Sequence, residues 1–312
     1  MSSLDISLIG SVITTVSFLV VAGYAFIHRK ELYRTTQHSN LISPAIITLS
    51  LVFALLNFYR FGNQEFGGHE VDVSRDLDLI IQYLGILVQS LLILVLFSSK
   101  IVSTPRVYTG RILAIGAHPD DIEIAAGAAL SKMRDTGYEI CGMIMSHGEK
   151  GGDGDTRPLE ARKGAKFLGF DDMTILDFTD RHLSAKAVEV TEAIEAVLEK
   201  EKPDIIFTHS NHDLHQDHQV VHEATLRAAR DIRTTILCYE SPSVTQDFHP
   251  TYFIDVAKYV DIKIQAIHSH WDQHKKPYMK DDVVRGKLAF RGAQAKVDYA
   301  EGFEVVRMVS GI

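Results

Sequence analysis

Two polar clusters in the second half of the chain carry side chains that bind metals. The first, residues 117–121 (AHPDD), directly follows an apolar run. A histidine and two carboxylates are costly beside a core unless they bind or pair. His118 and Asp121 are three residues apart at an expected helix start, so both can point the same way, with Asp120 beside a bound metal. The acids could equally cap the helix, because helix starts favour Asp.

The second cluster, residues 209–218 (HSNHDLHQDH), holds four of the chain's 15 histidines. Histidine is the commonest metal ligand, and two histidines with one carboxylate leave an open position on zinc, as in hydrolytic sites. His218 and His222 could also form an i, i+4 pair, but Gln219 replaces the glutamate base of an HExxH helix. We therefore expect a zinc site, with Fe²⁺ or Co²⁺ as alternatives because selectivity rests partly on metal availability.

A glycine-rich loop at residues 146–155 (SHGEKGGDGD) is a third polar segment. A phosphate loop is disfavoured because GxxxxGK[ST] is absent and three acids are present, and the spacing of an EF-hand does not occur. Glycine supplies backbone freedom, so the sequence favours a flexible active-site loop.

Short apolar runs that alternate with amphipathic stretches surround these clusters from about residue 104. This alternation predicts an α/β fold with a Rossmann-like, doubly wound, mostly parallel sheet. Such sheets bind ligands at the carboxyl ends of their strands. The expected strands are 111–117, 138–145, 173–176, 205–207 and 235–239, and the expected helices are 122–135, 158–168, 186–201 and 217–230.

The N-terminal third has a different composition. Residues 1–99 hold 12 of the 72 charged residues, so this part contacts a different solvent. Uncharged runs of about 20 residues can cross a ~30 Å hydrocarbon core. We expect a membrane anchor over residues 1–103, with three transmembrane helices at about 7–27, 41–59 and 79–99, and a catalytic domain over 104–312. A cleaved signal peptide fits less well, because the first run lacks a basic flank and exceeds the usual 7–15-residue core; three buried core helices are a further alternative.

Basic residues in the short loops predict the orientation. The loop 28–40 has three basic residues and one acid, whereas the loop 60–78 has two basic residues and five acids. Basic segments stay inside, so the N-terminus is expected outside and the catalytic domain in the cytoplasm of an integral membrane protein. Residues 100–312 carry 27 basic against 33 acidic side chains, which argues against a nucleic-acid partner. The sequence does not predict an oligomeric state.

Taken together, the motifs resemble the PIG-L/LmbE family of zinc-dependent N-deacetylases, such as GlcNAc-PI de-N-acetylase. AHPDD, the glycine-rich loop, Arg157-x-x-Glu160 before Leu168-Gly169, and His215-x-Asp217-His218 occur in the same order. The resemblance covers roughly residues 110–310 and leaves the N-terminal runs outside. The late His-x-Ser-Gln element of the family departs here to residues 268–274 (HSHWDQH).

The resemblance implies roles for individual residues. Asp120 would be the general base that takes a proton from zinc-bound water. His215 would steady the oxyanion or protonate the leaving amine, with Asp217 orienting it. The implied zinc ligands are His118, Asp121 and His218. The positions that face the sugar in the family are Arg157, Glu149 and Asp180.

These observations lead to a membrane-anchored, zinc-dependent hydrolase that removes an N-acetyl group from an amino sugar of the N-acetylglucosamine type. The anchor favours a glycolipid or other lipid-linked substrate and contact with membrane lipid. One alternative is a metal-dependent amidase for another small amide or a thiol-sugar conjugate. A second is a catalytically silent, membrane-bound binding module.

Overall fold

The computed structural model describes residues 3–28, 39–66, 75–98 and 110–309. The chain divides into two compact units, residues 1–100 and residues 101–312. The predicted domain boundary near residue 103 lies outside the described residues.

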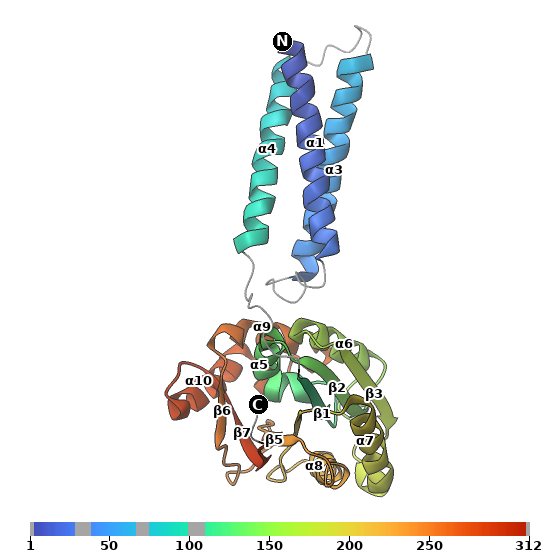
Figure 1. The fold of residues 1–312 in the computed structure, drawn as a ribbon, viewed down its shortest axis with the longest axis vertical. Coiled ribbons are helices and arrows are strands. Elements are labelled where there is room, and N and C mark those ends of the chain that lie inside the picture. The colour runs from blue at the N-terminus through green and yellow to red at the C-terminus, as the bar shows by residue number, and fades with distance from the viewer. Residues whose placement is uncertain (1–2, 29–38, 67–74, 99–109, 310–312) are drawn as a thin grey trace. The chain divides into compact units, whose positions relative to one another are not determined.

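In its described residues, 3–28, 39–66 and 75–98, the first unit contains three long helices: α1 (Ser3–Ile27), α3 (Ser39–Phe66) and α4 (Arg75–Ser98) (Figure 1). Uncharged runs of this length favour helix, because every backbone hydrogen bond is then made within the segment. Phe18 of α1 stacks on Phe53 of α3 with 5.3 Å between the ring centroids. Gln89 of α4 donates a hydrogen bond to Ser17 of α1, so polar contacts also join the helices.

Of the residues described, one helix is long and apolar enough to cross a membrane, α1 over Gly10–Ile27. The apolar stretches of α3 and α4, Pro44–Tyr59 and Tyr83–Leu94, are shorter than this requires. The prediction of three transmembrane helices is therefore supported for one helix only, by length and composition. A signal sequence or the core helix of a soluble protein has the same length and composition.

A seven-stranded sheet forms the second unit, in the order β3-β2-β1-β4-β5-β7-β6. β1 to β5 are parallel, and β7 is antiparallel to β5 and β6. The mixed α/β fold with a mostly parallel sheet is thus confirmed. The strands are β1 (Arg111–Gly116), β2 (Glu139–Ser146), β3 (Asp172–Phe178), β4 (Ile205–His209), β5 (Thr235–Tyr239), β6 (Tyr252–Asp255) and β7 (Ala300–Arg307).

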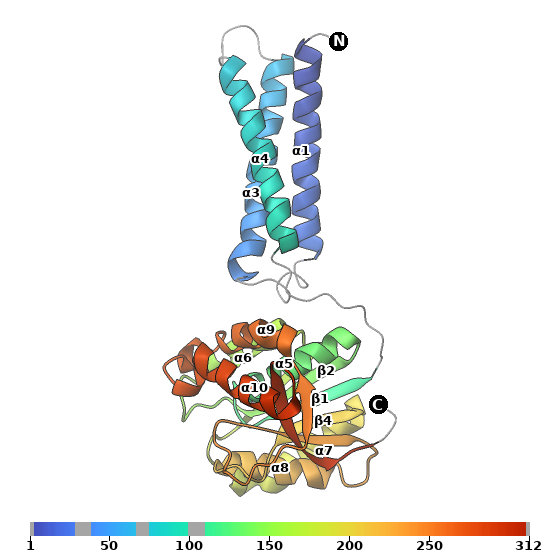
Figure 2. The same cartoon turned by 90° about the vertical axis from the view of Figure 1, so that its left-hand side faces the viewer.

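Helices cover both faces of this sheet (Figures 1 and 2). Helices α7 and α8 lie on one face, and helices α5, α6, α9 and α10 lie on the opposite face. Val190, Ile194 and Leu198 of α7 recur every four residues and are buried together with Leu113 and Ile115 of β1. The helices are α5 (Asp121–Thr136), α6 (Thr156–Leu168), α7 (Ala187–Glu201), α8 (Gln216–Ala228), α9 (Val260–Ile267) and α10 (Asp281–Ala295).

Candidate metal centre

The candidate centre lies where two neighbouring strands end. β1 leads into residues 117–121 and β4 leads into residues 209–218, and the two strands pair in parallel. The chain continues from β1 to β2 on one side, while β4 leads to β5 on the other. Ligands of such sheets bind in the crevice at this reversal.

The three predicted ligands converge on one another. Nδ1 of His118 lies 3.5 Å from Oδ2 of Asp121. Nε2 of His218 lies 3.3 Å from the same nitrogen of His118 and 3.4 Å from Oδ1 of Asp121. All three side chains are buried. Two imidazole nitrogens and a carboxylate at this spacing form the donor set of an open zinc site, so the residues fit a divalent metal.

Asp121 is fixed in place by its own loop. Its Oδ2 atom accepts hydrogen bonds from the main-chain N–H groups of Ala117 (3.0 Å) and His118 (2.8 Å). Burial opposes ionisation of this carboxyl, but its interactions with the imidazoles of His218, His209 and His118 outweigh burial and hold its pKa well below the usual range. Asp121 is therefore a pre-oriented anion whose Oδ1 atom faces His218.

Two carboxylates also lie beside His118, at the ring nitrogen that does not face His218. Its Nε2 atom lies 3.1 Å from Asp180 and 3.3 Å from Asp217. Asp217 also accepts hydrogen bonds from the main-chain N–H groups of Arg181 (2.6 Å) and Leu183 (3.3 Å). The Asp217 carboxylate therefore contacts His118. The family resemblance implies that Asp217 orients His215, and the contact between these two residues is made by the main-chain N–H of Asp217, which lies 3.3 Å from Nδ1 of His215.

The carboxylate of Asp213 holds one ring nitrogen of His218 in the same way, and the sequence gave Asp213 no role. Its Oδ2 atom lies 2.9 Å from Nδ1 of His218, and Ser241 and Ser243 donate hydrogen bonds to its carboxylate. Metal-binding histidines commonly bind a carboxylate through their second nitrogen. Applied to the acidic residues within 209–218, this rule would have made Asp213 a candidate partner of His218.

His209 is a second residue to which the sequence gave no role. It is fully buried and its ring stacks on that of His218 at 3.8 Å. Its Nε2 atom lies 3.2 Å from Oδ2 of Asp121. Burial, together with the charge of His218, lowers the pKa of His209 to about 4, so the ring is neutral at pH 7.

Asp120 has an unusual backbone conformation. Its φ of 113° lies in the left-handed region, which side chains other than glycine rarely adopt. Such strain collects at functional sites. The carboxyl is buried, with Arg157 3.4 Å away as the nearest cation that the structure describes, and burial raises its pKa. Asp120 is thus a buried carboxyl in a strained conformation, next in sequence to the predicted ligand Asp121.

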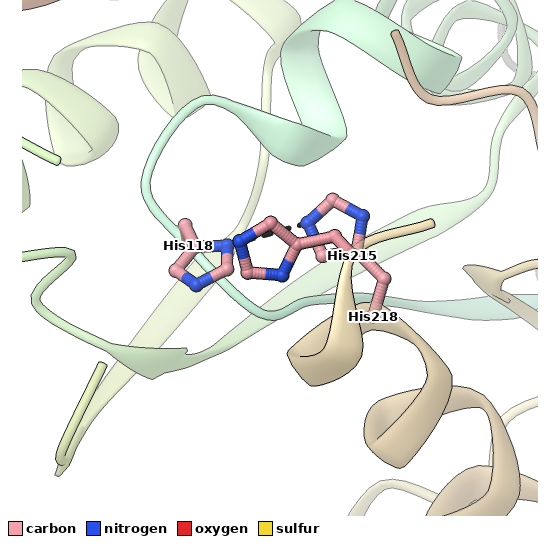
Figure 3. Close-up of side chains that lie close together, drawn as sticks. All are labelled: His118, His215 and His218. Carbon is pink, nitrogen blue, oxygen red and sulfur yellow. Dashed lines mark hydrogen bonds between the residues drawn. The ribbon is translucent and has the colours of Figure 1, made fainter. Parts of the chain in front are cut away.

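His215 completes the cluster at the start of α8 (Figure 3). Its ring centroid lies 4.7 Å from that of His118 and 4.5 Å from that of His218, and its side chain is half-buried. Burial and the charges of His218 and His118 lower its pKa, so the ring is neutral. Its Nδ1 atom accepts the N–H of Asp217, which leaves the proton on Nε2.

Known proteins resemble this chain in sequence as well as in fold. Residues 113–229 match the family PIG-L, described as GlcNAc-PI de-N-acetylase. The uncharacterized deacetylase YaiS of Escherichia coli is 36% identical over 166 residues, which are 51% of this chain and 89% of YaiS. The chain belongs to the PIG-L family.

Two further similar proteins are deacetylases by name. The diacetylchitobiose deacetylase of Thermococcus kodakarensis is 25% identical over 228 residues, 65% of this chain and 84% of that protein. The structure of N,N'-diacetylchitobiose deacetylase from Pyrococcus horikoshii matches with a TM-score of 0.56 over 63% of this chain and 84% of that chain. At 23% identity, the second likeness shows the fold alone.

The structure gives the predicted sugar-facing residues of this PIG-L domain other partners. Arg157 is buried and donates hydrogen bonds to the main-chain oxygens of Gly148 (2.6 Å) and Pro119 (2.7 Å). Asp180 binds His118, and this contact outweighs burial and lowers its pKa to about 2. Glu149 is exposed and accepts the N–H of Asp180 at 3.0 Å. Arg157 and Asp180 therefore contact residues of the candidate centre and support its structure.

The segment 268–274 packs against the glycine-rich loop and α6 of the PIG-L domain. The N–H of Asp272 binds Glu160 at 3.1 Å, and the amide of Gln273 donates to the main-chain oxygen of Gly151 at 3.2 Å. His270 is buried, with Nε2 3.2 Å from Glu123. Although this segment departs from the family element, it therefore contacts the glycine-rich loop, whose Gly148 accepts a hydrogen bond from Arg157.

Proposed function

We propose that this PIG-L protein is a zinc-dependent N-deacetylase that acts on an N-acetylated amino sugar of the N-acetylglucosamine type. The observation that carries the proposal is the convergence of His118, Asp121 and His218 beside the strained, buried carboxyl of Asp120. Two family descriptions support the sugar: GlcNAc-PI for the family and diacetylchitobiose for a relative.

His118, Asp121 and His218 would hold the metal, which when bound lowers the pKa of water to about 7 and polarises a carbonyl group. Asp120 accepts the proton of the water that attacks the acetyl carbon. Such proton transfer contributes about 10²–10⁴-fold to the rate. His215 donates a hydrogen bond from Nε2 to the developing oxyanion, and Asp120 passes the proton that it has taken from the water to the leaving nitrogen. The carbon–nitrogen bond then breaks, the nitrogen gains a proton, and acetate and a free amino sugar are released.

The N-terminal unit would anchor the enzyme in a membrane, with the N-terminus outside and the PIG-L domain in the cytoplasm. Large apolar side chains on α1, such as Val16, Val20 and Ile27, are more than half exposed. Lipid would cover such a surface, because contiguous exposed apolar surface marks an interaction site. An anchored enzyme would meet a glycolipid or other lipid-linked sugar at the membrane surface.

Acetate release tests the chemistry. The full chain, in detergent and loaded with zinc, is offered free, nucleotide-linked and lipid-linked N-acetylglucosamine. Release from a sugar by the unaltered protein, lost in Asp120→Asn and retained in the exposed-site control Asp247→Asn, is the expected result. No release from any sugar by zinc-loaded protein, nor by protein loaded with Fe²⁺ or Co²⁺, would overturn the proposal.

Anchoring is tested separately, by fractionation of cells that express the full chain. The protein should stay with membranes after an alkaline wash, and a chain without residues 1–100 should not. Recovery of the full chain in the soluble fraction would contradict the anchor and leave the deacetylase proposal intact.

A further inference from the structure

His209 is a buried histidine at the candidate centre to which neither the sequence nor the proposed function gives a role. It is the last residue of β4, and its side chain is fully buried. Its ring stacks on that of His218 with 3.8 Å between the centroids and 21° between the planes. The ring of Tyr239 meets it edge to face at 4.9 Å. Packing therefore fixes the ring of His209 against one of the predicted ligands.

His209 also contacts a second predicted ligand, Asp121. Its Nε2 atom lies 3.2 Å from Oδ2 of Asp121 and 3.1 Å from the main-chain nitrogen of Ala117. Its other ring nitrogen, Nδ1, is buried and has no hydrogen-bond partner among the described residues. The polar contacts of the ring therefore lie on the side of Asp121.

The surroundings of the ring decide which nitrogen of His209 carries the proton. A neutral imidazole has one N–H, which donates, and one bare nitrogen, which accepts. A proton on Nδ1 would bury an N–H without an acceptor and would set a bare nitrogen 3.2 Å from an anionic oxygen. A proton on Nε2 avoids both and donates to Oδ2 of Asp121. The N–H of Ala117 then donates to Oδ2 alone, at 3.0 Å.

Three N–H groups consequently converge on one oxygen of Asp121. The main-chain N–H groups of Ala117 and His118 donate to Oδ2 at 3.0 and 2.8 Å, and Nε2 of His209 adds the third at 3.2 Å. Each of these donors weakens the attraction of Oδ2 for a cation. The other oxygen, Oδ1, faces Nε2 of His218 at 3.4 Å and stays available to a metal.

The number of oxygens that Asp121 gives decides the geometry of the centre. One oxygen and two imidazole nitrogens leave a tetrahedral site with one open position, which is the preference of zinc. Two oxygens would raise the number of ligands and favour an ion such as Mn²⁺, which prefers oxygen ligands and octahedral geometry. The same three residues can therefore select different ions, according to how Oδ2 is held. Of the three donors to Oδ2, His209 is the one that a substitution can remove.

We propose that His209 is a positioning residue that holds Asp121 as a one-oxygen ligand and thereby sets the preference of the centre for zinc over manganese. It acts on Asp121 through the Nε2 proton, and stacking on His218 keeps the ring in place. The inference rests on the metal centre of the proposed function and adds how the chain selects its ion.

Two substitutions separate the ring of His209 from its proton. His209→Phe keeps an aromatic ring to stack on His218 and removes the donor, whereas His209→Gln keeps an N–H donor and removes the ring. Competition with a chromophoric chelator on the full-length proteins gives the affinities for Zn²⁺ and for Mn²⁺. We expect His209→Phe to lower the ratio of zinc affinity to manganese affinity about 10–100-fold, as loss of an outer partner of a metal ligand does. His209→Gln should retain the ratio, and so should His249→Gln, which alters an exposed histidine.

Cobalt gives a second readout that depends on neither affinity nor turnover. Co²⁺ with four ligands absorbs visible light more strongly than Co²⁺ with five or six, so the spectrum reports the number of ligands. The absorption of the cobalt-loaded His209→Phe protein should weaken, and that of His209→Gln should match the unaltered protein. His209→Met, which also lacks the donor, should behave as His209→Phe does and provides the test if phenylalanine is not accommodated. Thermal melting of each variant confirms that it is folded.

The outcomes separate this inference from the proposed function. An unchanged affinity ratio and spectrum in the folded variants without a donor would overturn the role of His209, while acetate release by the unaltered protein would still support the deacetylase. Equal losses in His209→Phe and His209→Gln would also overturn it, because the ring and not its proton would then matter. Failure of the unaltered protein to bind any of the three ions would overturn the metal centre itself.

Discussion

Nδ1 of His218 lies 2.9 Å from the carboxylate of Asp213, which comes five residues earlier in the chain. Two serines and the main-chain N–H of His215 bind the same carboxylate. Asp213 therefore cannot rotate away, and it fixes which nitrogen of His218 carries the proton. The other nitrogen, Nε2, is left to face Asp121 and His118 as a ligand.

Replacing this carboxylate should weaken metal binding. In Asp213→Asn the imidazole loses a charged acceptor, and the loss of such outer partners commonly lowers metal affinity about 10–100-fold. Competition with a chromophoric chelator on the full-length protein measures the affinity. Asp247→Asn, an exposed change in a nearby loop, serves as the control. Equal zinc affinity in Asp213→Asn and the unaltered protein would show that Asp213 does not tune the site.

The backbone of Asp120 leads to a prediction about stability. At a φ of 113°, glycine has no Cβ clash, whereas residues held in such regions cost about 1–3 kcal/mol. We expect Asp120→Gly to be more stable to unfolding by about this amount than Asp120→Ala, and both to lack activity. Denaturant unfolding of the metal-free proteins compares them. At an ordinary position glycine is the less stable of the two, so a more stable Asp120→Ala would contradict the strain.

The sequence predicts the centre well where residues are close along the chain. The strands and helices from 111 to 239 follow the expected pattern closely, because apolar runs and periodicity report local structure. The pattern of strands and helices places both polar clusters at the carboxyl ends of strands, and the family resemblance implies the ligand set His118, Asp121 and His218. The structure adds that the two strands are parallel neighbours.

The outer partners could not be predicted in this way. Asp180, Asp213 and Asp217 all lie in polar segments, and the direction in which each carboxylate points depends on packing between distant elements. Periodicity also failed after residue 240, where α9, α10 and the antiparallel pair β6 and β7 were missed. β6 has only four residues, too few for a periodic signal.

We expect Arg157 to stabilise the structure of the candidate centre. Its guanidinium group joins the main-chain oxygens of Gly148 and Pro119, and it is 3% exposed. Arg157→Met would leave both buried oxygens without their donor, at about 1–3 kcal/mol for each unsatisfied group. We therefore expect a clear drop in melting temperature, with activity falling through kcat. A rise in KM alone, with unchanged melting temperature, would instead support the sugar-binding role that the family resemblance implies.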